Sequence, residues 1–322
     1  MRYIKRMLAA AACAAAAAAA AQQFPEKPIT IIVPFTAGGS SDIVARTVQP
    51  KMIERLGQTI VVDNKPGANG GLAATYVAKA KNDGYTILVG SIGTYAINPV
   101  LYKDLAYDPR RDFDLLTVAV RTPNALVAHP GFPPNSVKEL IEYCKKNPNQ
   151  VSFASSGTGS SDHLTAALFW QKTGTTGIHI PYKGGSAAHL DLISGTANVS
   201  FQNLGSITNH VRSGKMKLLA VTSDKRDPTF PNVPTMAEVG VPGLEVYSWQ
   251  AFAAPKGLPK DAHAKLQSAL VGSLKDPAVA KKFNDIGFEV VANSPEEFAR
   301  FLNEELARWK QVVDAGGIKQ SD

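Results

Sequence analysis

The stretch ITIIVPFTAGGSSD, residues 29–42, decides the fold. Its first five residues, 29–33, form an unbroken apolar run, which is typical of a strand buried on both faces of a parallel sheet. Residues 34–41 predict a loop. Apolar residues at near-helical spacing then predict a helix from Asp42 to about Leu56, with a kink or break at Pro50. Strand, loop and helix in this order indicate the start of an α/β fold.

The same order of elements recurs along the chain. We predict further strands at 59–63, 85–89, 126–128, 151–154, 178–180, 199–201 and 218–221, and further helices at 72–81, 136–147, 162–173 and 187–194. This rhythm favours a doubly wound parallel sheet. A proline-rich path over residues 226–245 precedes the apolar run 249–254, and two helices follow at about 260–275 and 295–314. Two lobes that hinge where the chain crosses between them, near 119–128 and 246–253, fit this pattern.

Residues 1–21 are predicted to be a secretory signal peptide. They have a basic start (Arg2, Lys5, Arg6) and an alanine-rich apolar stretch, and small residues at positions 19 and 21 permit cleavage before Gln22. The alternatives are an uncleaved membrane anchor, for which the apolar stretch is short, and a lipoprotein modified at Cys13. A cleaved leader implies that the mature chain is exported.

Composition excludes several functional classes. The net charge of +7 falls to +4 without the three basic leader residues, and no basic run interleaves with aromatic residues, so we expect no nucleic-acid partner. After cleavage only Cys144 remains, and the histidines show no metal-ligand spacing, so we predict neither a disulfide nor a metal site. The chain also lacks a nucleotide-binding glycine motif, and we predict no cofactor.

Two Gly/Ser-rich loops are the candidate ligand site. Ligands in parallel sheets bind beyond the carboxyl ends of strands, where glycines let the backbone come close and helix N-termini offer free N–H groups to an anion. One such loop lies in each lobe, which favours a cleft that clamps an anionic group, although each alone could be a capped tight turn. The loops contribute Phe35, Thr36, Ala37, Gly38, Gly39 and Ser40, and Ser155, Ser156, Gly157, Thr158, Gly159, Ser160 and His163.

Other polar residues follow neighbouring strands. Ser91 and Thr94, Tyr182 and Gln202 are predicted to complete the site for this reason. Asn69 lies in a glycine-rich turn, where a positive φ angle explains it as well as ligand contact does.

A catalytic interpretation of Ser160, Asp162 and His163 is weaker. The segment is not a nucleophile elbow, and residues this close in sequence rarely form a triad by themselves. We therefore predict no catalytic residue and no enzyme activity.

The ordered motifs of the chain resemble the Bug family, the periplasmic substrate-binding proteins of tripartite tricarboxylate transporters. The resemblance covers about residues 24–315. It rests on VPF with GG (33–39), NKPGANG (64–70), DGYT (83–86), SGTGS with HL (156–164), PYKGG (181–185), LAVT (219–222), VPT (233–235) and Trp249 ahead of AP (254–255).

The resemblance implies a two-lobed, type II-like periplasmic binding fold that closes on a small carboxylate. Domain 1 would comprise residues 22–121 plus 252–322, and domain 2 residues 122–251. The resemblance also implies that the loop residues named above bind the ligand through amides, hydroxyls and waters, and that a membrane permease, or a signalling protein, is the partner. We expect a monomer.

One departure from the family bears on the ligand. Gln202 stands where many relatives carry aspartate, so a partner for a ligand ammonium group is missing. We therefore expect an amine-free dicarboxylate or aromatic acid. The alternatives are a serine hydrolase-like enzyme using Ser160 and His163, and a receptor for an inorganic anion such as phosphate.

Overall fold

The computed structural model describes residues 24–316, so the predicted leader and Cys13 lie outside the described residues. The first lobe contains β1 (Ile29–Val33) between β2 (Ile60–Asn64) and β3 (Thr86–Ser91), with both neighbours parallel to it. All of β1 except Thr30 is buried, which agrees with its apolar sequence. Helices α2 (Ser40–Leu56) and α3 (Gly71–Ala78) connect these strands, with the short turn η1 (Ala68–Gly70) ahead of α3.

Helix α2 runs through Pro50 without the break that the sequence allowed. A proline at this position leaves the carbonyl of Arg46, four residues earlier, without its helical partner. Both residues are exposed, so water can satisfy that carbonyl.

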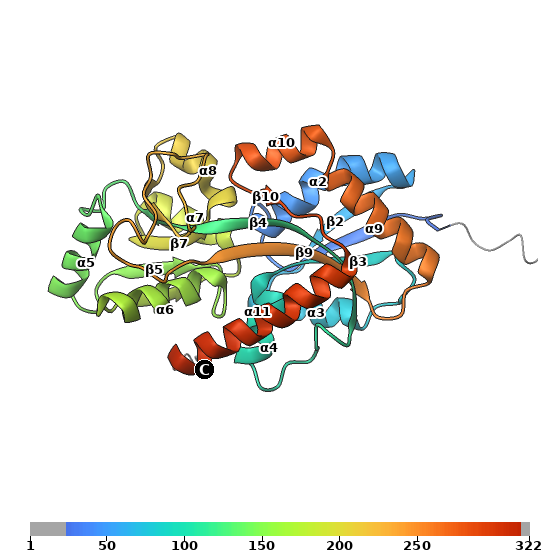
Figure 1. Cartoon of the computed structure of the whole chain (residues 1–322), viewed down its shortest axis with the longest axis horizontal. Helices are drawn as coiled ribbons and strands as arrows, with labels where there is room; N and C mark the ends of the chain where they lie inside the picture. Colours follow the sequence, from blue (N-terminus) through green and yellow to red (C-terminus); the bar gives the residue numbers. More distant parts are fainter. Residues whose placement is uncertain (1–23, 317–322) are drawn as a thin grey trace, which may run out of the picture.

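Two long strands cross from one lobe to the other (Figure 1). They are β4 (Phe113–Ala128) and β9 (Tyr247–Pro255), which pair antiparallel to each other. Strand β9 also pairs with β3 in the first lobe, whereas β4 continues to β7 (Val199–Asn203) and β8 (Lys217–Val221) in the second. The predicted strand at 126–128 is therefore only the end of a strand of 16 residues.

The second lobe repeats the first in outline. Strand β5 (Ser152–Ser155) lies parallel between β6 (Ile178–Pro181) and β7. The strand order is β2-β1-β3-β9-β4-β7-β5-β6, and β8 and β10 (Glu289–Val290) also pair with β4. Since β4 runs antiparallel to every strand it pairs with, the sheet is mixed. The parallel pairing that the sequence rhythm favoured occurs within each lobe.

Helices cover the sheet in both lobes, as Figure 1 shows. The second lobe carries α5 (Val137–Lys146), α6 (Ser161–Thr173), α7 (Gly185–Ser194) and α8 (Leu204–Arg212). The first lobe carries α9 (Lys260–Leu274), α10 (Pro277–Asp285) and α11 (Pro295–Gly316), together with η2 (Gly93–Ile97) and α4 (Asn98–Leu101). The sequence patterns did not predict α4, α8, α10, β10, η1 or η2. No helix within residues 24–316 combines the length and the apolar character that crossing a bilayer requires.

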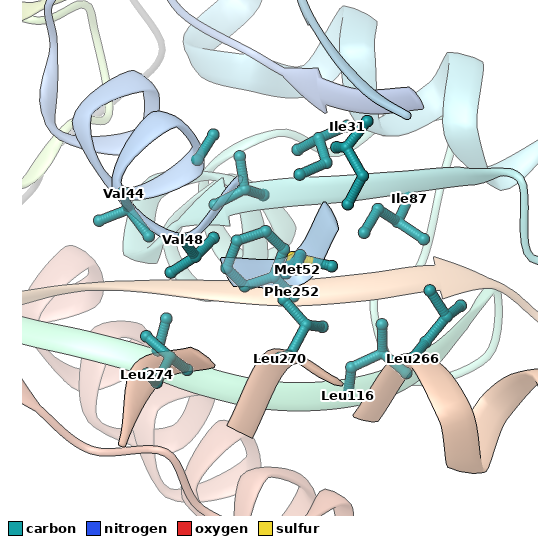
Figure 2. Close-up of a cluster of buried hydrophobic side chains, with 14 of the residues drawn as sticks. Ile31, Val44, Val48, Met52, Ile87, Leu116, Phe252, Leu266, Leu270 and Leu274 are labelled. Atoms are coloured by element: carbon teal, nitrogen blue, oxygen red, sulfur yellow. The ribbon is translucent and has the colours of Figure 1, made fainter. Parts of the chain in front are cut away.

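Each lobe has its own hydrophobic core. Figure 2 shows the first-lobe cluster, in which Val48 and Met52 of α2 and Leu270 of α9 meet Ile87 of β3 and Phe252 of β9. The second lobe has separate clusters, among them one built around Phe153, Phe169 and Phe201. Each fully buried side chain of this size contributes about 1.5–3 kcal/mol. A further cluster joins the lobes, because Leu164 of α6 is buried together with Ile97 and with Phe298 of α11.

Candidate functional site

The first Gly/Ser loop is held by an aspartate in the helix that follows it. The backbone N–H of Gly38 donates to Asp42 Oδ2 over 2.8 Å, and Arg46 and Asn64 also donate to this carboxylate over 2.9–3.0 Å. Burial raises the pKa of the Asp42 carboxyl, but these hydrogen bonds outweigh it and hold the pKa below its usual value. Gly38 has φ 84°, a conformation that favours glycine, so the loop needs this residue to turn.

The second loop is held in the same way, by hydrogen bonds to the carboxylate of Asp162. The backbone N–H of Ser156 donates to Asp162 Oδ2 over 2.9 Å, the Ser156 hydroxyl donates to the same oxygen, and the Ser161 hydroxyl donates to Oδ1 over 3.1 Å. Burial raises the pKa of Asp162 despite these bonds. The hydroxyl of Ser160 caps α6 by accepting from the His163 N–H over 3.2 Å. Both loops thus approach a helix N-terminus in a fixed shape.

The two loops face each other, and polar contacts pass directly between the lobes. The hydroxyls of Thr36 and Ser186 lie 2.7 Å apart, and the Ser40 hydroxyl donates to Asn203 Oδ1 over 3.0 Å. A cavity of about 30 Å³ lies between the loops. It has room for about two water molecules. The lobes are therefore in contact around a small cavity.

Seven of the predicted site residues line this cavity: Phe35, Gly39, Ser40, Ser91, Ser156, Ser160 and Gln202. Five line an adjoining groove, of which Phe35 and Ser156 are shared with the cavity and Gly157, Thr158 and Tyr182 are not. The remaining predicted residues belong to neither wall. Ala37 and Gly38 are exposed, whereas Thr94 and Ser155 are buried. The hydroxyl of Thr36 contacts that of Ser186. Gly159 donates its N–H to Nδ1 of His163 over 3.2 Å.

The cavity wall also contains residues that the sequence prediction left out. They are Ser41, Asn69, Ile92, Ser161, Asp162, Gly185, Asn203, Ser206, Ser248 and Gln250. Gln250 had a usable signal, because it is a polar residue inside the apolar run 249–254 of a buried strand. Asn69 has φ 47°, which agrees with the interpretation as a positive-φ position, and it also lines the cavity.

The wall offers hydrogen bonds and no cationic side chain. Among the described residues, neither lysine nor arginine lines this cavity; only Asp162 is ionisable there. Hydroxyls, carboxamides and the backbone around two helix N-termini make up its polar surface, a suitable environment for an anionic oxygen. Across residues 24–316, no group of three or more His, Cys, Asp or Glu side chains could hold a metal ion.

The histidines behind the second loop support it structurally. The rings of His163 and His179 stack with centroids 3.9 Å apart, and His179 Nε2 lies 2.7 Å from Ser155 Oγ. Burial lowers the pKa of His163 to about 4 and that of His179 to about 3, so both rings are neutral at pH 7. Asp162 bonds to serines, and the His163 ring receives the Gly159 N–H, so these three groups are arranged to shape the loop.

Comparison with known proteins identifies the family. The family model described as the tripartite tricarboxylate transporter family receptor, TctC, matches residues 44–318. The chain belongs to the TctC family. The resemblance to Bug proteins is confirmed by BugT of Bordetella pertussis, which is 35% identical over 297 residues, covering 92% of this chain and 91% of BugT.

Solved structures of TctC-like proteins share the fold. The structure titled R. palustris Rpa4515 with adipate is 36% identical, with a TM-score of 0.90, and the match covers 92% of this chain and 99% of that one. MatC (Rpa3494) from Rhodopseudomonas palustris, solved with bound malate, is 33% identical, with a TM-score of 0.86, and the match covers 90% and 100%. The two-lobed periplasmic binding fold expected from the sequence is thus confirmed.

Proposed function

We propose that this TctC-family chain is a solute-binding receptor that captures a small organic carboxylate between its lobes. One observation carries the proposal: two serine-rich loops, each leading into a helix N-terminus, face each other across one cavity that has no cationic side chain. Two relatives of the same fold are described with adipate and with malate, and both ligands are small carboxylates.

Binding would be coupled to closure of the lobes. A carboxylate held by peptide N–H groups, hydroxyls and bridging waters needs donors from both loops at once, which selects the closed arrangement. The cavity holds only about two water molecules, so a larger solute requires the lobes to part before it can enter. We place the moving bodies at residues 22–121 plus 252–322 and at residues 122–251, with β4 and β9 as the hinge.

The ligand class follows from Gln202. Its Oε1 lies 2.9 Å from His189 Nε2, and its amide nitrogen donates to Ser200 Oγ over 2.8 Å, so a neutral group with a hydrogen bond at each end lines the cavity. An ammonium group on the ligand would find no free carboxylate there. We therefore favour an amine-free dicarboxylate or an aromatic acid.

We also propose where the chain acts in the cell and what its partner is. Residues 1–21 would direct export and be removed, which leaves the mature chain in the periplasm. There it would deliver its solute to permease subunits of a tripartite transporter, or to a signalling partner, without chemical turnover.

A ligand screen tests the proposal. The mature chain, starting at Gln22, is heated with succinate, glutarate, adipate, benzoate, phosphate and the matching amino acids, and each hit is measured by calorimetry. We expect amine-free carboxylates to raise the melting temperature by mass action, with micromolar Kd values, about −8 kcal/mol. Stabilisation by phosphate alone, or tighter binding of the amino acid than of its amine-free counterpart, would contradict the proposal.

The hydrolase alternative needs a separate assay. An activated ester such as p-nitrophenyl acetate is incubated with the wild type and with Ser160→Ala. The receptor proposal expects no turnover by either protein above the rate in buffer. Turnover that disappears in Ser160→Ala would favour the enzyme.

A further inference from the structure

Exposed apolar side chains occupy matching positions in the two lobes. Six large apolar residues of the described chain are exposed: Ile53, Val61, Leu72, Tyr76, Ile178 and Leu190. Val61 (45% exposed) and Ile178 (47%) lie on β2 and β6, the strands at the two ends of the sheet. Tyr76 (52%) and Leu190 (69%) are each the sixth residue of the next α-helix, α3 or α7. Exposed apolar residues scattered singly need no explanation, but two equivalent pairs indicate a shared role.

In each lobe, the strand residue and the helix lie on the same side of the sheet. Val61 is the register neighbour of Thr30, so both point to the side of Ile32, which shares a buried cluster with residues of α3. Ile178 points to the side of Ala154, which shares a buried cluster with residues of α7. We define the first-lobe patch as Val61, Leu72 and Tyr76, and the second-lobe patch as Ile178 and Leu190.

Both patches flank the groove that adjoins the cavity. Gly67 and Tyr182 line this groove from the first and the second lobe. The side chain of Leu72 lies over Gly67, because a Cβ added to this glycine would come within 2.5 Å of Leu72 Cδ1. The Tyr182 hydroxyl donates to Asp191, the residue after Leu190. A protein seated over the groove would therefore touch both lobes at once.

The first-lobe patch has a basic border. Three lysines and one aspartate line the open groove beside Leu72 and Tyr76: Lys27, Lys79, Lys81 and Asp83. Asp83 pairs with Lys27 over 3.5 Å, whereas neither Lys79 nor Lys81 has an ion-pair partner within residues 24–316. Free ammonium groups next to exposed apolar side chains complement a surface that combines apolar and acidic residues.

We infer that the two patches form the docking surface for one partner protein, which covers the groove and presents apolar side chains to both lobes and acidic residues to α3. The inference rests on the proposed function and describes the permease or signalling partner of this receptor by its chemistry. Strands β2 and β6 each lie three strands from the nearest crossing strand, so the spacing between the patches changes when the lobes part. The partner therefore selects the arrangement of the lobes that matches its own surface.

A protein fits these patches better than a lipid surface does. In the described sheet, β2 pairs only with β1 and β6 only with β5. The outer edge of each strand thus leaves backbone N–H and C=O groups unpaired, and another polypeptide can pair with such an edge. The acyl chains of a membrane offer no hydrogen-bonding group to it.

Photocrosslinking in intact cells tests the surface. In the bacterium that encodes this chain, the full chain with its leader carries p-benzoylphenylalanine at the position of Tyr76, Leu190 or Ile53, and the cells are irradiated. We expect the positions of Tyr76 and Leu190 to crosslink to the same partner protein, which mass spectrometry identifies. Ile53 on α2 is the matched control, because it is exposed and apolar but lies outside both patches. It should yield none of this product.

Charge reversal tests the chemistry of the partner. With the crosslinker at Leu190, the double variant Lys79→Glu and Lys81→Glu should lower the yield about fivefold or more, because it sets like charges against each other. Lys145→Glu with Lys146→Glu is the matched control, since these two lysines are exposed and also lie at the end of a helix. It should keep the wild-type yield.

The charge variants should not affect the solute. Of the four lysines, none lines the cavity, so the Kd of a solute should stay within about twofold of the wild-type value. Circular dichroism and melting curves establish that each variant is folded.

The possible results separate the docking surface from the proposed function. If no carboxylate binds the purified chain, the receptor proposal itself fails. If carboxylates bind but Tyr76 and Leu190 crosslink to different proteins, or no more than Ile53 does, the receptor proposal stands and the docking surface is overturned. A yield that the reversal of Lys79 and Lys81 leaves unchanged overturns the acidic partner.

Two further results would replace the partner protein. A crosslinked product that contains only copies of this chain overturns the inference in favour of self-association. The purified mature chain is also mixed with vesicles of phosphatidylethanolamine and phosphatidylglycerol and sedimented. We expect it to stay in solution, and binding that disappears in the Lys79→Glu, Lys81→Glu variant overturns the inference in favour of a membrane surface.

Discussion

At the residue scale, Asp42 and Asp162 explain how loops made mostly of glycine and serine keep a binding shape. Each aspartate stands early in the helix after its loop and accepts a backbone N–H from within the loop, from Gly38 or from Ser156. Since such loops have little shape of their own, the carboxylates pre-organise the donors that would meet an anion. The contacts of the two aspartates are with the loops, so any effect on a solute would be exerted through the loops.

The first prediction concerns Asp162. In Asp162→Ala, the buried donors of Ser156 and Ser161 lose their acceptor, so the free energy of unfolding should fall by roughly 2–4 kcal/mol. Solute affinity should fall as well, because the second loop loses its shape. Urea unfolding and calorimetry measure both effects. Asp162→Asn, which retains one acceptor oxygen, should recover part of each loss; an alanine variant as stable as the wild type would show that the aspartate does not hold the loop.

The second prediction concerns the stacked histidines. Burial lowers the pKa of His163 to about 4, against about 6.5 in the unfolded chain, so the stabilisation it gives is complete above pH 6.5 and is lost as the pH falls toward 4. Between pH 6.5 and pH 5 the loss should be about 2 kcal/mol from this residue. Urea unfolding at the two pH values measures it. His163→Gln should reduce the pH dependence by this amount, and an unchanged slope would show that the ring is protonated as easily in the folded protein.

Sequence patterns at this scale predict which residues line the cavity where the signal is local. Glycine and serine next to a helix start are visible in sequence, and Phe35, Ser40, Ser156 and Ser160 all line the cavity. Gln250 was missed because its position depends on a strand that returns from far along the chain. No local pattern shows which loop that strand will face.

At the scale of elements, two serine helix caps allow an effect on stability to be separated from an effect on binding. Ser136 caps α5 by accepting from the Glu139 N–H over 3.2 Å, and the Glu139 carboxylate accepts from the Asn135 N–H over 2.8 Å. Ser160 caps α6 with the same geometry but also lines the cavity. The two serines thus form a matched pair.

The third prediction uses this pair. Ser136→Ala and Ser160→Ala should each lower the free energy of unfolding by about 1 kcal/mol, the usual cost of a lost cap. Only Ser160→Ala should also weaken solute binding, by severalfold, because Ser160 lines the cavity and Ser136 does not. Denaturation and calorimetry on both variants provide the comparison. Equal effects on binding would mean that the hydroxyl of Ser160 contributes nothing to the solute.

Element prediction failed where long-range pairing overrides the local pattern. Strand β4 contains Arg121 and Pro123, which look like a boundary in sequence. In the fold, Arg121 is exposed and its guanidinium bonds to Glu289 of β10 over 2.8–2.9 Å, while Pro123 lies opposite Tyr247 of β9. A strand that crosses between lobes can contain a charged residue and a proline, because its middle segment lies between the two lobes.

At the scale of the whole molecule, the two lobes meet next to the cavity through neutral polar contacts. The Thr36–Ser186 and Ser40–Asn203 pairs bridge the lobes next to the cavity, and neither contains a charged group. Because neutral hydrogen bonds contribute only about 0.5–1.5 kcal/mol each, such contacts can be broken and remade when a solute enters and leaves. The sequence predicted the two lobes, but the distance between their loops is a property of the assembled sheet.

The last prediction introduces a wedge between the lobes. A methyl group on Gly184, ahead of α7, would come within 2.5 Å of Thr36 Oγ1 and 3.0 Å of its backbone nitrogen. Gly184→Ala should therefore keep the lobes apart, which enlarges the radius of gyration in small-angle scattering and weakens solute binding by about tenfold or more. Gly184 has φ 151°, so local strain also needs a control.

Gly214→Ala supplies that control, because Gly214 has φ 70° and no heavy atom lies within 4 Å of the added methyl group. It should lose about 1 kcal/mol of stability through backbone strain, while its scattering profile and its solute affinity match those of the wild type. If Gly184→Ala binds solute as tightly as Gly214→Ala, contact between the lobes at Thr36 is not needed for capture, and the solute must be held by one lobe alone.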